Sequence, residues 1–212
     1  MQKFLLSALS VFLFFPALAQ DSLLSEMAGL PEYTASRSVS KDWLLDASGF
    51  RAGIYKGKGG KDLIISNGLI ERCFRVSPNL GCYSFRNLTN GEEMLRAIKP
   101  EAVLILNGEL IRVGGLEGEF EYGYTRYEWL DQFKAGSNDF VVTGFKVNDI
   151  RPKIDWTPKR WIPGHNWPPK GKEICFSFTS KSHPGIMAEV HYELFDGIPL
   201  ISKWFNLVNY SG

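Results

Sequence analysis

The sequence has no excess of charge of either sign. Its 212 residues carry 24 lysines and arginines against 23 aspartates and glutamates, without a block of like charges. Proteins that bind nucleic acid or anionic membranes electrostatically present a basic patch or stripe. We therefore expect neither nucleic acid nor a membrane among the partners of this chain.

Motifs of nucleophilic, zinc-hydrolytic and nucleotide-binding sites are also missing. The chain contains no G-x-S-x-G, no H-E-x-x-H and no P-loop. The glycine-rich stretch 53–60 carries lysines and is typical of a turn, not of a strand-to-helix phosphate cradle. A glycosidase needs two carboxylates held across the scissile bond, and no acidic pair is marked out. The sequence therefore predicts no complete catalytic set and no cofactor.

Cysteine is scarce, with only Cys73, Cys82 and Cys175. An odd count leaves at least one thiol unpaired within the chain. Cys73 and Cys82 flank an expected hairpin turn at unequal distances from its centre, so we do not expect a disulfide between them. No C-x-x-C or Cys/His spacing indicates zinc, and no metal site is predicted.

Long apolar runs are absent except at the N-terminus. Lys3 precedes an apolar run over residues 4–15, Pro16 ends that run, and small residues flank a leucine at 17–19. This is the pattern of a secretory signal, and the run is shorter than the roughly 20 residues of a membrane-spanning helix. We predict a cleaved signal peptide over residues 1–19 and a protein that is secreted, to the periplasm or the extracellular space.

Helical periodicity is confined to the stretch after this signal. Leu23, Leu24 and Met27 recur at helical spacing within residues 21–32, before a glycine and a proline. We therefore expect a short helix in an N-terminal extension over residues 20–61.

From residue 62 onward, strand-length apolar runs alternate with turn dipeptides, several of them Asn-Gly. No strand–helix–strand alternation appears, which disfavours a doubly wound fold. We predict an all-β domain over residues 62–212, a large antiparallel two-sheet sandwich. The expected strands lie at 62–66, 69–76, 82–88, 101–106, 140–147, 173–179, 186–195 and 200–209. Neighbours of the last strand come either from earlier in the chain or from a longer polypeptide, in which case the sandwich is incomplete at its C-terminus.

The segment 151–171 is unusually rich in tryptophan and proline. It holds Trp156, Trp161 and Trp167, three of the six tryptophans, and five of the eleven prolines. Indole faces give the C–H surface of a sugar an apolar platform while the ring N–H can still donate. These tryptophans and His165 are the candidate carbohydrate-binding residues. The alternative is a long crossover whose tryptophans pack as a lid on the sandwich.

A second candidate cluster lies on the expected strand 186–195. Glu189, His191 and Glu193 share one of its faces, and apolar residues share the other. A histidine between two carboxylates can do acid–base work or bind metal. The simpler interpretation is a solvated strand face, because alternation alone places polar residues there. No third ligand lies at an obvious spacing.

Several stretches, in their order along the chain, carry a family resemblance. They are ISNGLIER at 65–72, LRA at 95–97 with PEA at 100–102, VGGL at 113–116, WPPKG at 167–171 and HYELFDGIPL at 191–200. Together they resemble the N-terminal β-supersandwich of α-galactosidase-like glycoside hydrolases (family 36 and relatives), a module similar in fold to galactose mutarotase. The resemblance spans residues 62–209.

The resemblance implies a division of labour. In such enzymes the sandwich is not catalytic, and the nucleophile and acid lie in a following (β/α)₈ barrel that this chain does not contain. A sandwich loop with aromatic residues can approach the sugar site of the barrel, a role that the stretch 156–167 would fill here. The expected function is thus the non-catalytic front module of a secreted α-galactosidase-like enzyme. Its partners would be a C-terminal catalytic barrel in a longer polypeptide and a galactoside-like carbohydrate.

Two other functions stay open. One is a stand-alone carbohydrate-binding module that uses the tryptophan-rich segment. The other is a mutarotase-type enzyme, for which Glu189, His191 and Glu193 would be the only stand-ins, because the catalytic His and Glu motifs of mutarotases are not found in this sequence.

Overall fold

The chain folds almost entirely into antiparallel β-sheets. The computed structural model describes residues 15–35, 42–157, 159 and 167–210. Within these residues the strands form sheets of five, four and two strands, and the helical elements are α1 (Phe15–Ala28) and the 3₁₀ helix η1 (Tyr127–Gln132). The predicted all-β, antiparallel class is confirmed.

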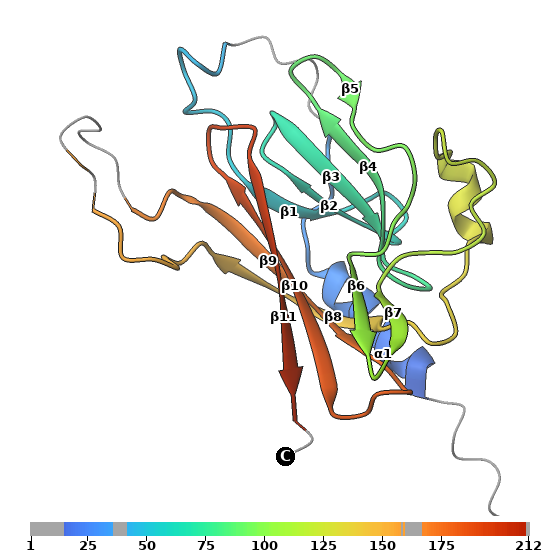
Figure 1. Ribbon diagram of the computed structural model, residues 1–212. Helices are drawn as coiled ribbons and strands as arrows, with labels where there is room; N and C mark the ends of the chain where they lie inside the picture. The colour runs from blue at the N-terminus through green and yellow to red at the C-terminus, as the bar shows by residue number, and fades with distance from the viewer. Residues whose placement is uncertain (1–14, 36–41, 158, 160–166, 211–212) are drawn as a thin grey trace, which may run out of the picture.

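The two larger sheets follow simple hairpin orders (Figure 1). The five-stranded sheet has the order β1-β2-β3-β4-β5, the four-stranded sheet has the order β11-β10-β9-β8, and β6 pairs with β7. The strands are β1 (Gly53–Lys56), β2 (Asp62–Ser66), β3 (Ile70–Arg75), β4 (Gly81–Asn87), β5 (Glu92–Glu93), β6 (Ala102–Leu106), β7 (Glu109–Val113), β8 (Val141–Asp149), β9 (Gly171–Thr179), β10 (Ile186–Phe195) and β11 (Ile201–Asn209).

The two larger sheets bury their inner faces in one hydrophobic core. Leu63 of β2 and Phe74 of β3 are fully buried there, together with Phe176 of β9 and Tyr192 of β10. The ring centroid of Phe74 lies 5.4 Å from that of Phe176 and 5.4 Å from that of Tyr192. Period-two alternation puts such side chains on one face of each strand. The sheets therefore face each other across this core.

Helix α1 packs against the same core. The sequence predicts a helix within 21–32, and the structure places it at Phe15–Ala28, ending just before Gly29. Leu23 and Met27 are buried in the core cluster. The helix crosses the predicted cleavage point after residue 19, so both buried anchors belong to the part that a mature chain would keep. None of the helices in the described part of the chain has the length and hydrophobicity needed to span a bilayer.

Strand β1 corrects the interpretation of 53–60 as a turn. Residues 53–56 pair with β2, and Ile54 is buried opposite Ile65. The turn itself is shorter and begins at Gly57, whose N–H donates to the carbonyl of Asp62 over 2.8 Å. Ile54 is the one buried side chain in this four-residue strand, which is why its sequence carries so weak a periodic signal.

The turn at residue 67 connects β2 to β3, as its Asn-Gly sequence predicts, and it also contacts the other sheet. The Asn67 side chain is buried. Its Oδ1 accepts from the N–H groups of Leu69 (2.9 Å) and Ile70 (3.1 Å), and its Nδ2 donates to the carbonyls of Phe195 and Ile198, 2.7 Å each, at the β10–β11 turn. One side chain therefore joins a turn of each large sheet.

Candidate functional site

The outer face of the five-stranded sheet is polar in sequence but largely covered in the structure. Glu71, Cys73 and Arg75 of β3 point away from the core, yet all three are buried. The segment 117–134, which contains η1, lies over this face. It is fixed by a small cluster of Ile98, Leu116, Leu130 and Phe133, against which Tyr83 and Trp129 pack.

Arg75 and Asp62 form a buried ion pair beneath this cover. Arg75 Nε lies 2.7 Å from Asp62 Oδ1, and the two side chains are only 2% and 4% exposed. The hydroxyl of Tyr127 in η1 donates to Asp62 Oδ2 over 2.7 Å, and the guanidinium lies 5.3 Å from the centroid of the Tyr127 ring. The pair thereby attaches the covering segment to β2 and β3.

Between the sheet and its cover lies a pocket of about 450 Å³, which we call the tyrosine pocket. This volume falls within the range of small-molecule sites, which combine aromatic walls with a few placed polar groups. Its walls come from the N-terminal extension, β3, β4, β5 with the residues that follow it, and the start of η1 with the residues before it. The lining residues are Tyr33, Glu71, Cys73, Tyr83, Ser84, Arg86, Glu93, Leu95, Tyr124, Thr125 and Tyr127.

The acidic groups of the tyrosine pocket are held in place by hydrogen bonds. Glu71 accepts from the hydroxyl of Tyr33 and from the guanidinium of Arg86, whose Nε lies 2.7 Å from Oε1. Glu93 accepts from Ser84 Oγ over 2.6 Å and from two backbone N–H groups. Burial raises the pKa of both Tyr33 and Tyr83 above the usual value of a tyrosine. For Tyr33, the neighbouring Glu71 raises the pKa further. Both phenols therefore stay neutral and able to donate.

The predicted strand cluster lies on the outer face of the four-stranded sheet. Glu189, His191 and Glu193 share that face of β10, and the register places His191 opposite Cys175 of β9 and Trp204 of β11. The His191 side chain is only 13% exposed, because Trp204 stacks on its ring with centroids 4.7 Å apart and planes within 10°. The interpretation as a simple solvated face is therefore wrong at His191.

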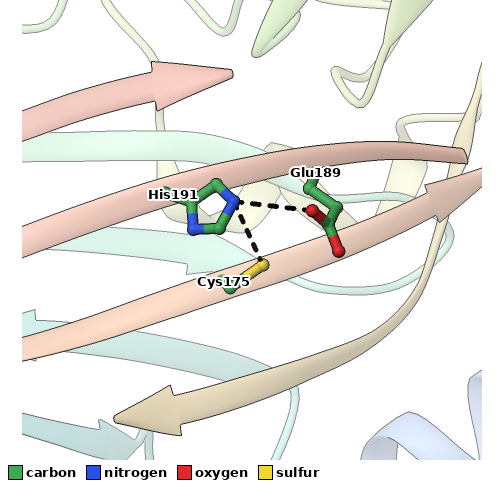
Figure 2. A group of neighbouring side chains, drawn as sticks. All are labelled: Cys175, Glu189 and His191. Atoms are coloured by element: carbon green, nitrogen blue, oxygen red, sulfur yellow. Dashed lines mark hydrogen bonds and ion pairs between the residues drawn. The ribbon is translucent and has the colours of Figure 1, made fainter. Parts of the chain in front are cut away.

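His191 contacts residues from β9 that sequence spacing alone did not identify. Its Nδ1 lies 2.9 Å from Glu173 Oε1, and its Nε2 lies 3.6 Å from Cys175 Sγ and 3.7 Å from Glu189 Oε2. Figure 2 shows Cys175, Glu189 and His191 converging across β9 and β10. We call Glu173, Cys175, Glu189 and His191 the His191 cluster. Linear spacing indicated no Cys/His metal-binding pattern, because Cys175 and His191 come together only when β9 pairs with β10.

Glu193 belongs to a different set of contacts. It forms an ion pair with Lys153 and accepts from Ser202 Oγ over 3.1 Å. Lys153 lies at the start of the tryptophan-rich segment, and its Nζ lies 3.0 Å from the centroid of the Trp204 ring. Lys153 therefore connects the two regions that the sequence singles out separately.

Two of the predicted aromatic residues come together. The rings of Trp156 and Trp167 lie with centroids 5.1 Å apart, and the residues are 36% and 38% exposed. Trp167 Nε1 donates to the carbonyl of Ile154 over 3.1 Å. Trp161 and His165 lie outside the described residues.

No family model matches this chain, and no curated protein or solved structure is significantly similar to it. The family resemblance therefore depends on the sequence stretches between residues 65 and 200 alone.

All three cysteines are free and buried. Cys73 and Cys82 are thus not bonded to each other, as the sequence led us to expect. Burial raises the pKa of Cys82 and of Cys175 to about 12, and raises that of Cys73 as well. We expect native thiols at about pH 8 to react at least about 100-fold more slowly than those of the unfolded chain, because the thiolate is the reacting form. Thiol titration with and without denaturant measures this, and one fast native equivalent would contradict it.

Proposed function

We propose that this chain is the non-catalytic, carbohydrate-binding sandwich of a secreted α-galactosidase-like glycoside hydrolase. In this proposal the two larger sheets are the layers of a galactose-mutarotase-like supersandwich, and the catalytic carboxylates belong to a barrel in a longer polypeptide. The shared core of the sheets and the order of the sequence stretches support the fold assignment.

The observation that carries the proposal is the tyrosine pocket. Tyr33, Tyr83, Tyr124 and Tyr127 offer aromatic surface to the C–H face of a sugar ring. Glu71, Glu93 and Arg86 place charged acceptors and donors beside them, which suits a ligand with many hydroxyl groups. Cys73, the thiol in the lining, is buried with a raised pKa, so this pocket favours binding over covalent chemistry.

A second binding surface is favoured by the exposed pair of Trp156 and Trp167. Adjacent tilted indoles can contact successive faces of an oligosaccharide. This surface is the basis of the alternative function, a stand-alone carbohydrate-binding module.

Calorimetric and fluorescence titration of the purified chain with galactose and α-galactosides tests the proposal. We expect saturable binding, and Tyr124→Ala should weaken it about 5-fold, because an aromatic contact contributes about 1 kcal/mol. Tyr122→Ala is the matched control, since Tyr122 is exposed on the same segment but does not line the pocket.

The results separate the two surfaces. If Trp156→Ala loses binding and Tyr124→Ala does not, the sugar site lies at the tryptophan pair, which would favour the stand-alone module. No heat and no fluorescence change at millimolar sugar would overturn carbohydrate binding altogether. The barrel is tested by reading the coding sequence past residue 212, where a stop codon would contradict the longer enzyme.

A further inference from the structure

Three potential metal-ligand atoms converge on the outer face of the four-stranded sheet, on the sheet that does not form the tyrosine pocket. They are His191 Nε2, Cys175 Sγ and Glu189 Oε2, and all lie within 4.8 Å of one another (Figure 2). Among the described residues, no other set of three or more His, Cys, Asp or Glu side chains brings its ligand atoms this close together. The geometry depends on the pairing of β9 with β10, which places Cys175 opposite His191.

The spacing of these atoms fits tetrahedral zinc. Zinc binds imidazole nitrogen at about 2.0–2.1 Å and thiolate sulfur at about 2.3 Å, so the edge joining N and S in a tetrahedron is about 3.6 Å. The distance from His191 Nε2 to Cys175 Sγ is 3.6 Å. The distance from Nε2 to Glu189 Oε2 is 3.7 Å, against about 3.4 Å for an edge joining N and O. Along these two edges the ligand atoms need to move only by tenths of an ångström, and the third edge, from Cys175 Sγ to Glu189 Oε2, is no longer than 4.8 Å.

The histidine is oriented as zinc-binding histidines usually are. Its Nδ1 faces Glu173 Oε1 at 2.9 Å, which favours the tautomer with the proton on Nδ1. In that tautomer the Nε2 lone pair lies on the side of Cys175, Glu189 and the amide nitrogen of Asn206. The stacked ring of Trp204 holds the imidazole plane. A carboxylate behind a ligating histidine both orients the ring and raises its basicity.

The donor types and their charges select the metal. A thiolate, an imidazole and a carboxylate together suit zinc, whereas calcium and magnesium prefer sites made of oxygen atoms. On binding, Cys175 exchanges its thiol proton for the Zn–S bond and releases that proton to the solvent. Thiolate and carboxylate then neutralise the two charges of the ion.

We propose that Cys175, Glu189 and His191 form a zinc site with three protein ligands and one open position, and that Glu173 is its positioning residue. The amide of Asn206 lies 3.3 Å from His191 Nε2 on the exposed side. The fourth ligand there is a water, or an oxygen atom of a bound molecule. The site does not depend on the tyrosine pocket or on the proposed function.

Cobalt substitution tests the site directly. The full chain is first reduced and freed of bound metal with a chelator. It is then titrated with Co²⁺, and afterwards with Zn²⁺ in competition with a chromogenic chelator that reports the free Zn²⁺. We expect one Co²⁺ per chain, a thiolate-to-cobalt charge-transfer band, visible bands of tetrahedral cobalt, and their loss when Zn²⁺ is added. Cys175→Ser should abolish the charge-transfer band, His191→Ala should weaken Zn²⁺ binding at least about 100-fold, and Glu173→Gln about 10- to 100-fold with the band kept.

Matched controls distinguish the site from other groups. Glu193→Gln changes a carboxylate on the same strand and face but outside the group, and Cys73→Ser removes another buried thiol. Both should keep the wild-type spectrum and Zn²⁺ affinity. Circular dichroism checks that each variant is folded. If Cys175→Ser does not fold, Glu189→Gln becomes the critical variant.

Two results would overturn the zinc site. The first is a wild-type chain that shows no charge-transfer band, which would mean a hydrogen-bonded cluster only. The second is a band that persists in Cys175→Ser or an affinity unchanged in Glu189→Gln, which would place the metal elsewhere.

Discussion

Arg75→Met is expected to lower the free energy of unfolding by about 3–5 kcal/mol, because it leaves the buried carboxylate of Asp62 without its cation. Asp62 retains only the hydroxyl of Tyr127 among the partners described above, and the Asp62 side chain is 4% exposed. The covering segment should also loosen, since Tyr127 stacks near the guanidinium. Chemical denaturation followed by circular dichroism measures the loss.

Two further variants identify the cause of that loss. Asp131→Asn removes the exposed carboxylate that also contacts Arg75 and should leave the denaturation midpoint almost unchanged. The double variant Asp62→Leu with Arg75→Met removes both charges and should recover most of the stability. If Arg75→Met alone lowers the free energy of unfolding by less than about 1 kcal/mol, the ion pair does not hold the covering segment to β2 and β3.

Asn67→Ala should be similarly costly, at about 3–5 kcal/mol. It deletes four hydrogen bonds. The buried N–H groups of Leu69 and Ile70 lose their side-chain acceptor, at about 1–3 kcal/mol each, and the contact with the β10–β11 turn is lost as well. Asn67→Asp keeps the acceptor but turns a carboxylate oxygen toward the carbonyl oxygens of Phe195 and Ile198, so it should cost at least as much as Asn67→Ala. Equilibrium denaturation of the three proteins gives the comparison.

Asn90 offers a matched control for Asn67. It also precedes a glycine in a turn of the five-stranded sheet, but it is exposed and bonds only locally, to Glu92. Asn90→Ala should change stability by no more than about 0.5 kcal/mol. Equal losses at the two positions would show that local turn preference, and not the contact with the β10–β11 turn, determines the cost at Asn67.

Much of the fold is predictable from the sequence because alternation and turn dipeptides are local signals. The strands expected at 62–66, 69–76 and 186–195 correspond to β2, β3 and β10. Strand β7 was missed because its adjacent apolar residues, the exposed Leu110 and the buried Ile111, mask the alternation. Alternation accounts for the outward direction of the polar residues of β3, but no local pattern predicts that the segment 117–134 buries them.

The sites are less predictable because they join segments that are distant in the sequence. Alternation correctly placed Glu189, His191 and Glu193 on one face, but it could not place Cys175 beside them without the register of β9 and β10. The tyrosine pocket was missed for a similar reason, since Tyr33 and Tyr83 come from separate segments. The one local signal was the aromatic run 120–129, which contains Tyr124 and Tyr127.

The pairing of Cys175 with His191 has a consequence for folding studies. Side chains alternate between faces, so a slip of one residue between β9 and β10 would turn His191 toward the interior and away from the thiol. Cobalt could then no longer be coordinated by the thiolate and the imidazole at the same time. The colour of the cobalt-loaded chain during refolding would therefore report when these two strands reach their native alignment, a step that far-ultraviolet spectra of β-structure do not resolve.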